Sequence, residues 1–469
     1  MKKGERKPPM KTLFKPRSIA VIGASNDPSR IGAMPIRFLL KHGYLGEIYP
    51  VNPKYQEVFG LPCYPTLRST PGKVDLVLVA IQRRFVPGAL QECSEKKVPY
   101  AILFTAGYGE TGVEGKKEQE ALLRFARQSG IRLIGPNCIG IVCPHENLTA
   151  SFISGLEMPR LIPGHIGVIA QSGGVCNAIL TRSSDRLMGL RALISTGNEL
   201  DLEMTDFIEH FVQDPQTRAI ALLMESLKDP AKFIRAADRA MHENKPLVVL
   251  KLGRSEKGRQ AAASHTGAMA GAYAVYQGLF RQKGICSVSD IDELFEVAHL
   301  LSCYGARGGH RLAILSTSGG TGALMADLAA DNFLHLPVPS ARTRDRLHDL
   351  MPATTSMANP MDITTQFMND ADAISRYLQT FGEDENFDVL VLVLTLSTSE
   401  QTLSLARRLA LIAPSLKKPL VVCWPVGMIA HRAFRHLDQA GVPLFFQPAI
   451  CMSALGHFAR YGKFQKARA

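Results

Sequence analysis

Residues 17–32, Arg-Ser-Ile-Ala-Val-Ile-Gly-Ala-Ser-Asn-Asp-Pro-Ser-Arg-Ile-Gly, decide the fold class of the N-terminal part of the chain. The apolar run at 19–22 is typical of a buried strand, and a helical pattern that extends to Leu40 follows the turn. A strand that leads through a glycine turn into a helix offers free N–H groups to a phosphate. The stretch therefore predicts a Rossmann-like α/β domain with an anion site at its first turn.

The turn and the next strand discriminate between nucleotide ligands. Gly-Ala-Ser-Asn does not match the G-x-G-x-x-G of a dinucleotide site, and the strand at 46–51 leads to Lys54 where a nicotinamide site uses Asp or Glu. A lysine suits a nucleotide with an extra ribose phosphate, and coenzyme A carries a 3′-phosphate as well as a diphosphate. An ordinary turn of this type with an incidental lysine is the alternative.

Strand and helix patterns alternate along the rest of the chain with short loops. This alternation predicts parallel, doubly wound sheets that bind ligands at the carboxyl ends of their strands. Prolines at 155–164 and a glycine-rich basic stretch at 305–309 separate three such series. We expect an α/β protein with domains at 1–150, 151–305 and 306–469. The loops at 106–110 and 135–138 are candidate walls of a cofactor cleft in the first domain, although glycine turns that only reverse the chain are equally common.

Composition limits the classes of function. The chain has 469 residues, of which 46% are hydrophobic and 20% charged, and this indicates well-developed cores. The net charge is +12, but basic residues are spread along the chain, so anionic small molecules are favoured over nucleic acid. The nine cysteines include no CxxC pair, which argues against a zinc site and for a reducing cytoplasm. We expect neither a signal peptide nor a membrane span, because no apolar run approaches the required length.

His265 is the first candidate catalytic residue. It follows a buried strand pattern at 246–251 and lies in a segment of Gly, Ala, Ser and Thr. Small neighbours leave the ring nitrogens unhindered, and Gly267 and Gly271 loosen the backbone, which suits a nucleophile that accepts a group in one place and releases it in another. The alternative is a closely packed helix that His265 only caps.

Two further features are expected at the same sheet edge as His265. Ser172, Gly173 and Gly174 follow a strand pattern and would present helix N-terminal N–H groups to a phosphate. Glu225 ends another strand, and a carboxylate bonded to one imidazole nitrogen would leave the other as the nucleophile. A surface carboxylate is the alternative for Glu225. The Ser-Gly-Gly element recurs at 318–320 in the third series, which suggests two related domains.

Five motifs occur in order along the chain, at 23–25, 135–140, 171–174, 264–271 and 359–362. Together they resemble the nucleoside-diphosphate-forming (ADP-forming) acyl-CoA and acetate–CoA synthetases, which are relatives of the succinyl-CoA ligase α subunit. The resemblance covers nearly the whole chain after residue 12. It implies that a Rossmann-like CoA-binding domain is followed by two flavodoxin-like, succinyl-CoA synthetase-like domains.

The resemblance also implies a reaction and a set of roles. Acyl-CoA, phosphate and ADP would be interconverted with a carboxylic acid, CoA and ATP through an acyl phosphate and a phosphohistidine. His265 would carry the phosphoryl group, and Glu225 would orient its ring. CoA would lie near Gly23, Ala24, Ser25, Lys54 and Asn137.

The resemblance further implies a partner. The chain shows no pattern for the Gly-rich ATP-grasp module that holds the nucleotide in this family. We therefore expect a separate ATP-grasp β-type subunit that binds the Mg-nucleotide, an α2β2 assembly, and no metal site on this chain.

Two alternatives remain at this point. A CoA- or acyl-CoA-sensing regulatory module would share the fold, but in related acetyltransferase fusions the synthetase-like part has lost the histidine that is present here as His265. A nicotinamide oxidoreductase is disfavoured by Lys54 and by the glycine pattern.

Overall fold

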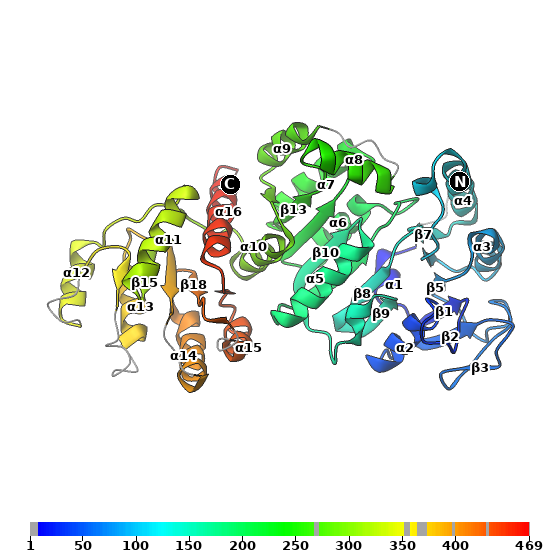
Figure 1. The fold of residues 1–469 in the computed structure, drawn as a ribbon, viewed down its shortest axis with the longest axis horizontal. Coiled ribbons are helices and arrows are strands. Elements are labelled where there is room, and N and C mark those ends of the chain that lie inside the picture. The colour runs from blue at the N-terminus through cyan, green and yellow to red at the C-terminus, as the bar shows by residue number, and fades with distance from the viewer. Residues whose placement is uncertain are drawn as a thin grey trace. The chain divides into compact units, whose positions relative to one another are not determined.

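The structure of the chain is a computed structural model that describes residues 8–266, 272–350, 357–363, 373–395, 399–427 and 431–468, without the side chains of 262–266, 399, 432 and 434. These residues form two compact units (Figure 1). The first unit comprises Met1–Asp185, Gly189–Glu243 and Val249–Lys283, and the second comprises Arg186–Met188, Asn244–Val248 and Gly284–Ala469.

The first unit begins with a parallel sheet in the order β2-β1-β5-β6-β7. Its strands are β1 (Ser18–Ile22), β2 (Glu47–Val51), β5 (Leu76–Val79), β6 (Tyr100–Leu103) and β7 (Arg132–Ile134), and a small hairpin of β3 (Glu57–Val58) and β4 (Leu61–Pro62) follows β2. The main helices are α1 (Met10–Phe14), α2 (Met34–Lys41), α3 (Val86–Glu95) and α4 (Val113–Ser129). Strands β1, β5 and β6 are almost completely buried, as short apolar runs flanked by helices require.

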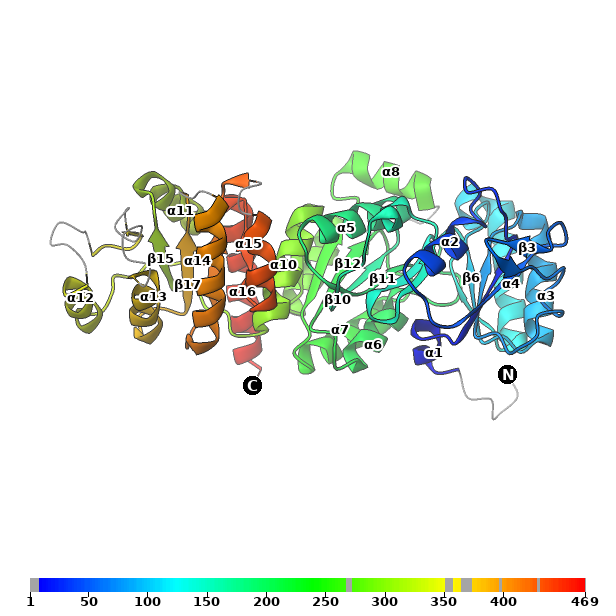
Figure 2. The same ribbon diagram turned by 90° about the horizontal axis from the view of Figure 1, so that it is seen from below.

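A second sheet contains, within the same unit, the consecutive strands β13-β12-β10-β11-β8-β9. Its strands are β8 (Gly140–Cys143), β9 (Leu148–Ser151), β10 (Pro163–Ala170), β11 (Leu190–Ser195), β12 (Ala219–Met224) and β13 (Leu247–Lys251). The helices are α5 (Gly173–Asp185), α6 (Met204–Gln213), α7 (Pro230–His242), α8 (Glu256–Thr266) and α9 (Tyr273–Gln282), and Figure 2 shows the same elements from below. Strand β8 is antiparallel to both β9 and β11.

The second unit contains a parallel sheet in the order β16-β15-β17-β18-β19. The strands of the unit are β14 (Cys286–Val288), β15 (Leu312–Ser316), β16 (Met361–Asp362), β17 (Val389–Val393), β18 (Leu420–Cys423) and β19 (Leu444–Phe445). Its helices are α10 (Ile291–Tyr304), α11 (Gly319–Asp331), α12 (Ala341–His348), α13 (Ala373–Glu383), α14 (Ser399–Ile412), α15 (His431–Gln439) and α16 (Pro448–Lys466).

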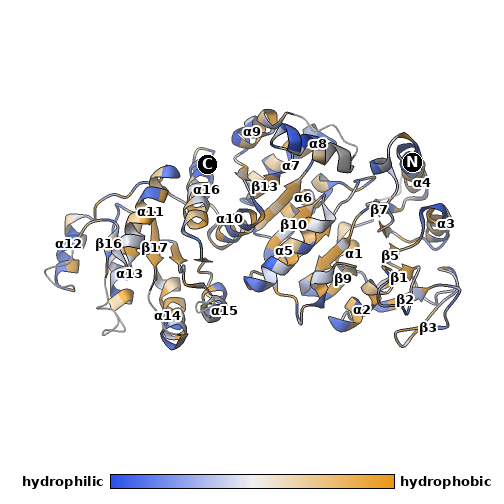
Figure 3. Ribbon diagram, in the orientation of Figure 1, coloured by the Kyte–Doolittle hydropathy of each residue, from blue (hydrophilic) through white to orange (hydrophobic). Residues whose placement is uncertain are grey.

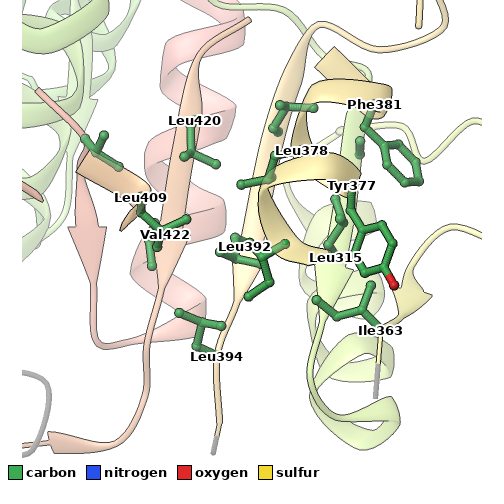
Figure 4. Close-up of a cluster of buried hydrophobic side chains, with 14 of the residues drawn as sticks. Leu315, Ile363, Tyr377, Leu378, Phe381, Leu392, Leu394, Leu409, Leu420 and Val422 are labelled. Atoms are coloured by element: carbon green, nitrogen blue, oxygen red, sulfur yellow. The ribbon is translucent and has the colours of Figure 1, made fainter. Parts of the chain in front are cut away.

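Apolar side chains of strands and helices form the cores of these sheets. Figure 3 shows the strands as predominantly hydrophobic ribbons. In the third sheet, Leu315, Leu392 and Val422 belong to one buried cluster with Leu378 of α13 and Leu409 of α14, as Figure 4 shows. Burial of one such side chain contributes about 1.5–3 kcal/mol, so this layer stabilises the strands whose ends carry the loops.

The prediction of parallel, doubly wound α/β sheets is confirmed. Numbered along the chain, the first and third sheets both have the order 2-1-3-4-5, which is the flavodoxin-like order of a doubly wound sheet. In such sheets, ligands bind beyond the carboxyl ends of the strands.

Some elements differ from those expected. Strands β8 and β9, which span residues 140–151, belong to the second sheet, and β10 begins at Pro163 within the stretch expected to be a linker. A proline is tolerated there because it is the first residue of the strand. The division at 1–150, 151–305 and 306–469 remains a prediction. In the part of the chain that the structure describes, no helix is long and apolar enough to cross a membrane.

Candidate functional site

The turn after β1 requires its glycine. Gly23 has φ +90°, and a Cβ atom there would lie 2.4 Å from the carbonyl oxygen of Ala80. The N–H groups of Gly23 and Ala24 both donate to the carbonyl of Val51, at 3.0 and 3.3 Å. Ala24 and Ser25 are buried. The predicted phosphate turn is thus a tight loop held between the ends of β2 and β5.

Lys54 is connected to this turn through Asn52. The Asn52 amide donates to the carbonyl of Ala24 at 2.7 Å, and its oxygen accepts from the N–H of Lys54 at 3.0 Å. The side chain of Lys54 is exposed. The structure therefore brings the backbone of Lys54 to the turn and leaves its ammonium group to solvent, where it is accessible to an anionic ligand.

Asn137 follows β7 at the same edge of the first sheet. Its φ is +58°, a left-handed conformation that Asn tolerates, and its N–H donates to the carbonyl of Thr105 at 3.0 Å. Its amide donates to Asn198 Oδ1 at 3.3 Å. A Cβ atom at Gly197 would lie 2.6 Å from the carbonyl oxygen of Asn137, so the loop after β11 packs directly on this residue.

Asn198 joins the two expected cleft walls. Its side-chain amide also donates to the Glu110 carboxylate at 2.5 Å, and its backbone carbonyl accepts from Lys228 Nζ at 2.6 Å. The loops that follow β6, β7, β11 and β12 therefore meet in one polar network. The turn Gly109–Thr111 also contacts α8, the helix that contains His265.

The segment 172–174 lies at the start of α5, directly after β10, as expected. Ser172 and Gly173 are half-buried, and Gly174 is exposed, with no atom within 4 Å of the position of a Cβ. A helix N-terminus at the carboxyl edge of a parallel sheet favours an anion by about 0.3–2 kcal/mol.

Gln171 connects this helix start to Glu225. Its side-chain oxygen accepts from the N–H groups of Glu225 and Ser226 at 2.6 and 3.0 Å, and its NH₂ donates to the carbonyl of Ser226 at 3.0 Å. Glu225 is 5% exposed, so the surface-carboxylate alternative is wrong. The backbone of Glu225 and the helix start are thus held at the ends of adjacent strands, because β10 pairs with β12.

Lys251 is a buried cation that sequence reasoning missed. It ends β13, is 1% exposed, and donates from Nζ to the carbonyls of Glu225 at 2.8 Å and Leu252 at 2.5 Å. The ammonium group also lies over the ring of Tyr276, 4.7 Å from its centroid. Burial lowers the pKa of Lys251 to about 8, while the charge of Glu225 opposes this shift.

Glu199 is a second buried ionisable residue that was not anticipated. It has φ +54° and is 3% exposed, and its carboxylate accepts from the N–H of Met204 at 3.0 Å. Burial raises the pKa of Glu199 to about 7, and the positive charge of Lys228 opposes the shift. Lys228 donates to the carbonyl of Glu199 at 2.5 Å, so the pair closes the network around Asn198.

His265 lies in the last turn of α8, which follows β13. Its side chain is outside the described residues, as are residues 267–271 of the same motif, so the contact of its ring with Glu225 remains a prediction.

In the motif at 359–362, Asn359 has a structural role. Asn359 binds the backbone of Leu312, Pro337 and Ile314 and thereby fixes the start of β15.

Among the described residues, no group of three His, Cys, Asp or Glu side chains is placed to hold an ion.

Two family models cover the two N-terminal sheets. The CoA binding domain matches residues 17–144, and the succinyl-CoA ligase like flavodoxin domain matches residues 163–301. Fold and matches together define an α/β protein in which a CoA-binding domain precedes a succinyl-CoA ligase-like flavodoxin domain.

Full-length relatives narrow this class. The acetate–CoA ligase [ADP-forming] II subunit alpha of Pyrococcus furiosus is 34% identical over 442 residues, which are 93% of this chain and 94% of that protein. The acetate–CoA ligase [ADP-forming] I of Archaeoglobus fulgidus is 37% identical over 97% of this chain, but the chain spans only 64% of its length. A solved structure of the dinucleotide forming acetyl-coenzyme A synthetase 1 of Ca. Korarchaeum cryptofilum, in complex with phosphate and ADP, has a TM-score of 0.88 at 30% identity and covers 98% of each chain. The chain belongs to the family of ADP-forming acetate–CoA ligases.

Proposed function

We propose that this chain is the α-type subunit of a nucleoside-diphosphate-forming acyl-CoA synthetase, which interconverts acyl-CoA, phosphate and ADP with a carboxylic acid, CoA and ATP. The observation that carries the proposal is a set of hydrogen bonds between the Gln171 side chain and the backbone of Glu225 and Ser226, which we call the Gln171 clamp. The clamp fixes the backbone of the buried Glu225 to the residue before α5, at the sheet edge where β13 leads into the helix with His265.

The first step is acyl transfer to phosphate. A phosphate oxygen attacks the thioester carbonyl carbon, the C–S bond breaks, and CoA leaves as the thiol after it takes up a proton. The N–H groups at Ser172, Gly173 and Gly174 would hold the phosphate and stabilise the charge that develops on it. CoA would lie on the first sheet, along Gly23, Ala24, Ser25, Lys54 and Asn137.

The second step is phosphoryl transfer to His265. One imidazole nitrogen attacks phosphorus, the bond to the acyl oxygen breaks, and the carboxylic acid leaves as its carboxylate. Glu225 would bind the opposite ring nitrogen and stabilise the charged ring of the phosphohistidine. The burial of Glu225 supports this role because an ion pair is stronger in a site that excludes water.

The nucleotide step would require a partner. The alignment with α subunits, and the greater length of the Archaeoglobus relative, support a separate ATP-grasp β-type subunit that holds the Mg-nucleotide. We propose an α2β2 assembly. The phosphohistidine would carry its phosphoryl group to ADP on that subunit.

Reconstitution tests the proposal. The purified chain should form no ATP from an acyl-CoA, phosphate and ADP, and should gain the activity when an ATP-grasp partner is added. A His265→Ala chain with the same partner is the control and should stay inactive. Full ATP formation by the chain alone would contradict the two-subunit proposal, and activity of the His265→Ala complex would contradict the phosphohistidine.

A further inference from the structure

A basic cavity of about 710 Å³ lies in the second unit, at the end of the third sheet where β15 begins. This is the opposite end from Ser318 and Gly319, which follow the carboxyl end of β15. The cavity is lined by residues of three segments, 308–311, 332–335 and the C-terminal half of α16, together with Asp388.

The floor of the cavity is tightly built. A Cβ atom at Gly308 would lie 2.1 Å from the carbonyl oxygen of Phe458, and one at Gly309 would lie 2.3 Å from the Cβ of Asp388. Arg311 forms a bidentate pair with the Asp388 carboxylate, at 2.7 and 3.2 Å. The charges of this pair cancel, so the charge of the cavity comes from elsewhere.

Three cations on one face of α16 supply that charge. Arg460, Lys463 and Lys466 recur at a spacing of three, and all three are exposed. None of them has a carboxylate partner among the described residues. Lys463 and Lys466 also lie in the last turn of the helix, where they complement the helix dipole. The dipole does not explain the position of Arg460, or of an aromatic residue that also lines the cavity.

Phe333 is that aromatic residue, and its backbone conformation is energetically unfavourable for a residue other than glycine. Helix α11 ends in a Schellman motif, in which Phe333 N–H donates to Ala330 and Leu334 N–H donates to Ala329, at 3.1 and 2.9 Å. Phe333 occupies the left-handed position with φ +59°, where glycine is usual, and its side chain is 83% exposed. A strained backbone and an exposed ring together indicate a function for the ring.

We propose that this cavity binds a nucleoside diphosphate or triphosphate. The phosphates would lie against Arg460, Lys463 and Lys466, and the base would stack on Phe333. Aromatic platforms next to cations recognise the base and phosphates of a nucleotide in this way, and the volume lies within the range of small-molecule sites. The imidazoles of His310 and His335, in edge-to-face contact at 5.1 Å, form a further wall.

A site-specific fluorescence titration tests the proposal on the full chain. The single tryptophan of the chain, Trp424, is completely buried, so Phe333→Trp introduces an exposed indole at the position where the base is expected. ADP should quench this emission saturably and leave the emission of the wild type unchanged. Adenosine and inorganic pyrophosphate, which each supply half of the ligand, should bind more weakly than ADP.

Two variants test which side chains of the cavity bind the phosphates and which bind the base. Lys463→Glu with Lys466→Glu should weaken ADP and pyrophosphate about tenfold or more, and added salt should weaken both in the wild type. Phe333→Gly should weaken ADP, measured by calorimetry, about tenfold and leave pyrophosphate unaffected. It should also raise the melting temperature, because glycine suits the left-handed position, so loss of ADP binding could not be ascribed to unfolding.

The proposal is overturned if ADP causes no saturable quenching of the Phe333→Trp chain, or if the lysine variants bind ADP as tightly as the wild type. Equal affinities for ADP and pyrophosphate would also overturn it, since the cavity would then bind only anions. Acyl-CoA-dependent phosphorylation of the chain should be unchanged in the lysine variants. A failure of the nucleotide site can therefore be distinguished from a failure of the reaction proposed above.

Discussion

Lys251 Nζ donates a hydrogen bond to the backbone carbonyl of Glu225 at 2.8 Å, and so links the ends of two neighbouring strands. The same ammonium group binds the carbonyl of Leu252 and lies over Tyr276. A positive charge is therefore fixed next to the backbone carbonyl of Glu225, the proposed orienting residue. We infer that Lys251 is a positioning residue for Glu225.

Lys251→Met should change how stability depends on pH. Burial lowers the pKa of Lys251 to about 8 from 10.5, so the unfolded chain binds one more proton between these values. The free energy of unfolding of the wild type should therefore rise relative to Lys251→Met as the pH increases through this window. Urea denaturation at a series of pH values measures this difference. A difference that stays constant would show that the buried lysine does not titrate in the window.

Gln171→Met should disconnect Glu225 from the start of α5. It removes three hydrogen bonds to the 225–226 backbone and leaves buried groups unsatisfied, which costs about 1–3 kcal/mol for each such group. We expect a lower unfolding midpoint and slower phosphorylation of the chain by acyl-CoA and phosphate. Gln171→Glu retains the acceptor for both N–H groups and should lose less stability. Equal losses in the two variants would argue against the clamp.

Gly23→Ala and Gly174→Ala form a matched pair. The first places a methyl group 2.4 Å from the Ala80 carbonyl at a positive φ, and should destabilise the fold by about 1–3 kcal/mol and weaken CoA binding. The second has open space and should be neutral or stabilise by up to about 1 kcal/mol, because alanine favours the helix. Thermal unfolding and CoA titration check both. A Gly23→Ala chain that is as stable as Gly174→Ala would contradict the geometry of the turn.

Glu199→Gln should remove a decline of stability with rising pH. Burial raises the pKa of Glu199 to about 7 from 4.5, so the folded chain holds an extra proton between these values. The wild type should lose stability relative to Glu199→Gln as the pH rises through this window. Parallel curves for wild type and Glu199→Gln would contradict the assignment.

Local patterns predicted the sheets and the glycine turns because both are encoded in short stretches. The run that ends at Gly23 and the Ser-Gly-Gly element at 172–174 each form the strand-turn-helix unit that their residues indicate. Strands β8 and β9 were missed because an antiparallel hairpin before a proline-rich stretch interrupts the expected alternation.

The polar connections of the site depend on contacts that are distant in sequence. The sequence pattern places Lys251 at the end of a buried strand but does not predict a buried ammonium group, because the lysine side chain is usually exposed. Its burial depends on Tyr276 and on the backbone of residue 225, neither of which is adjacent in sequence. Likewise, Gln171 bonds to Glu225 and Ser226, which lie 54 and 55 positions further along the chain. These contacts cannot be predicted unless it is known that β10 and β12 are adjacent in the sheet.

Phosphorylation of the chain tests the central claim most directly. The full chain, with its partner subunit, would be incubated with an acyl-CoA and radiolabelled phosphate in the absence of ADP, and the label located by peptide mapping. The account predicts acid-labile label on His265 that requires the acyl-CoA, falls about a hundredfold or more in Glu225→Gln, and is absent in His265→Ala. Label of equal amount in His265→Ala, or no label on the wild-type complex, would contradict it.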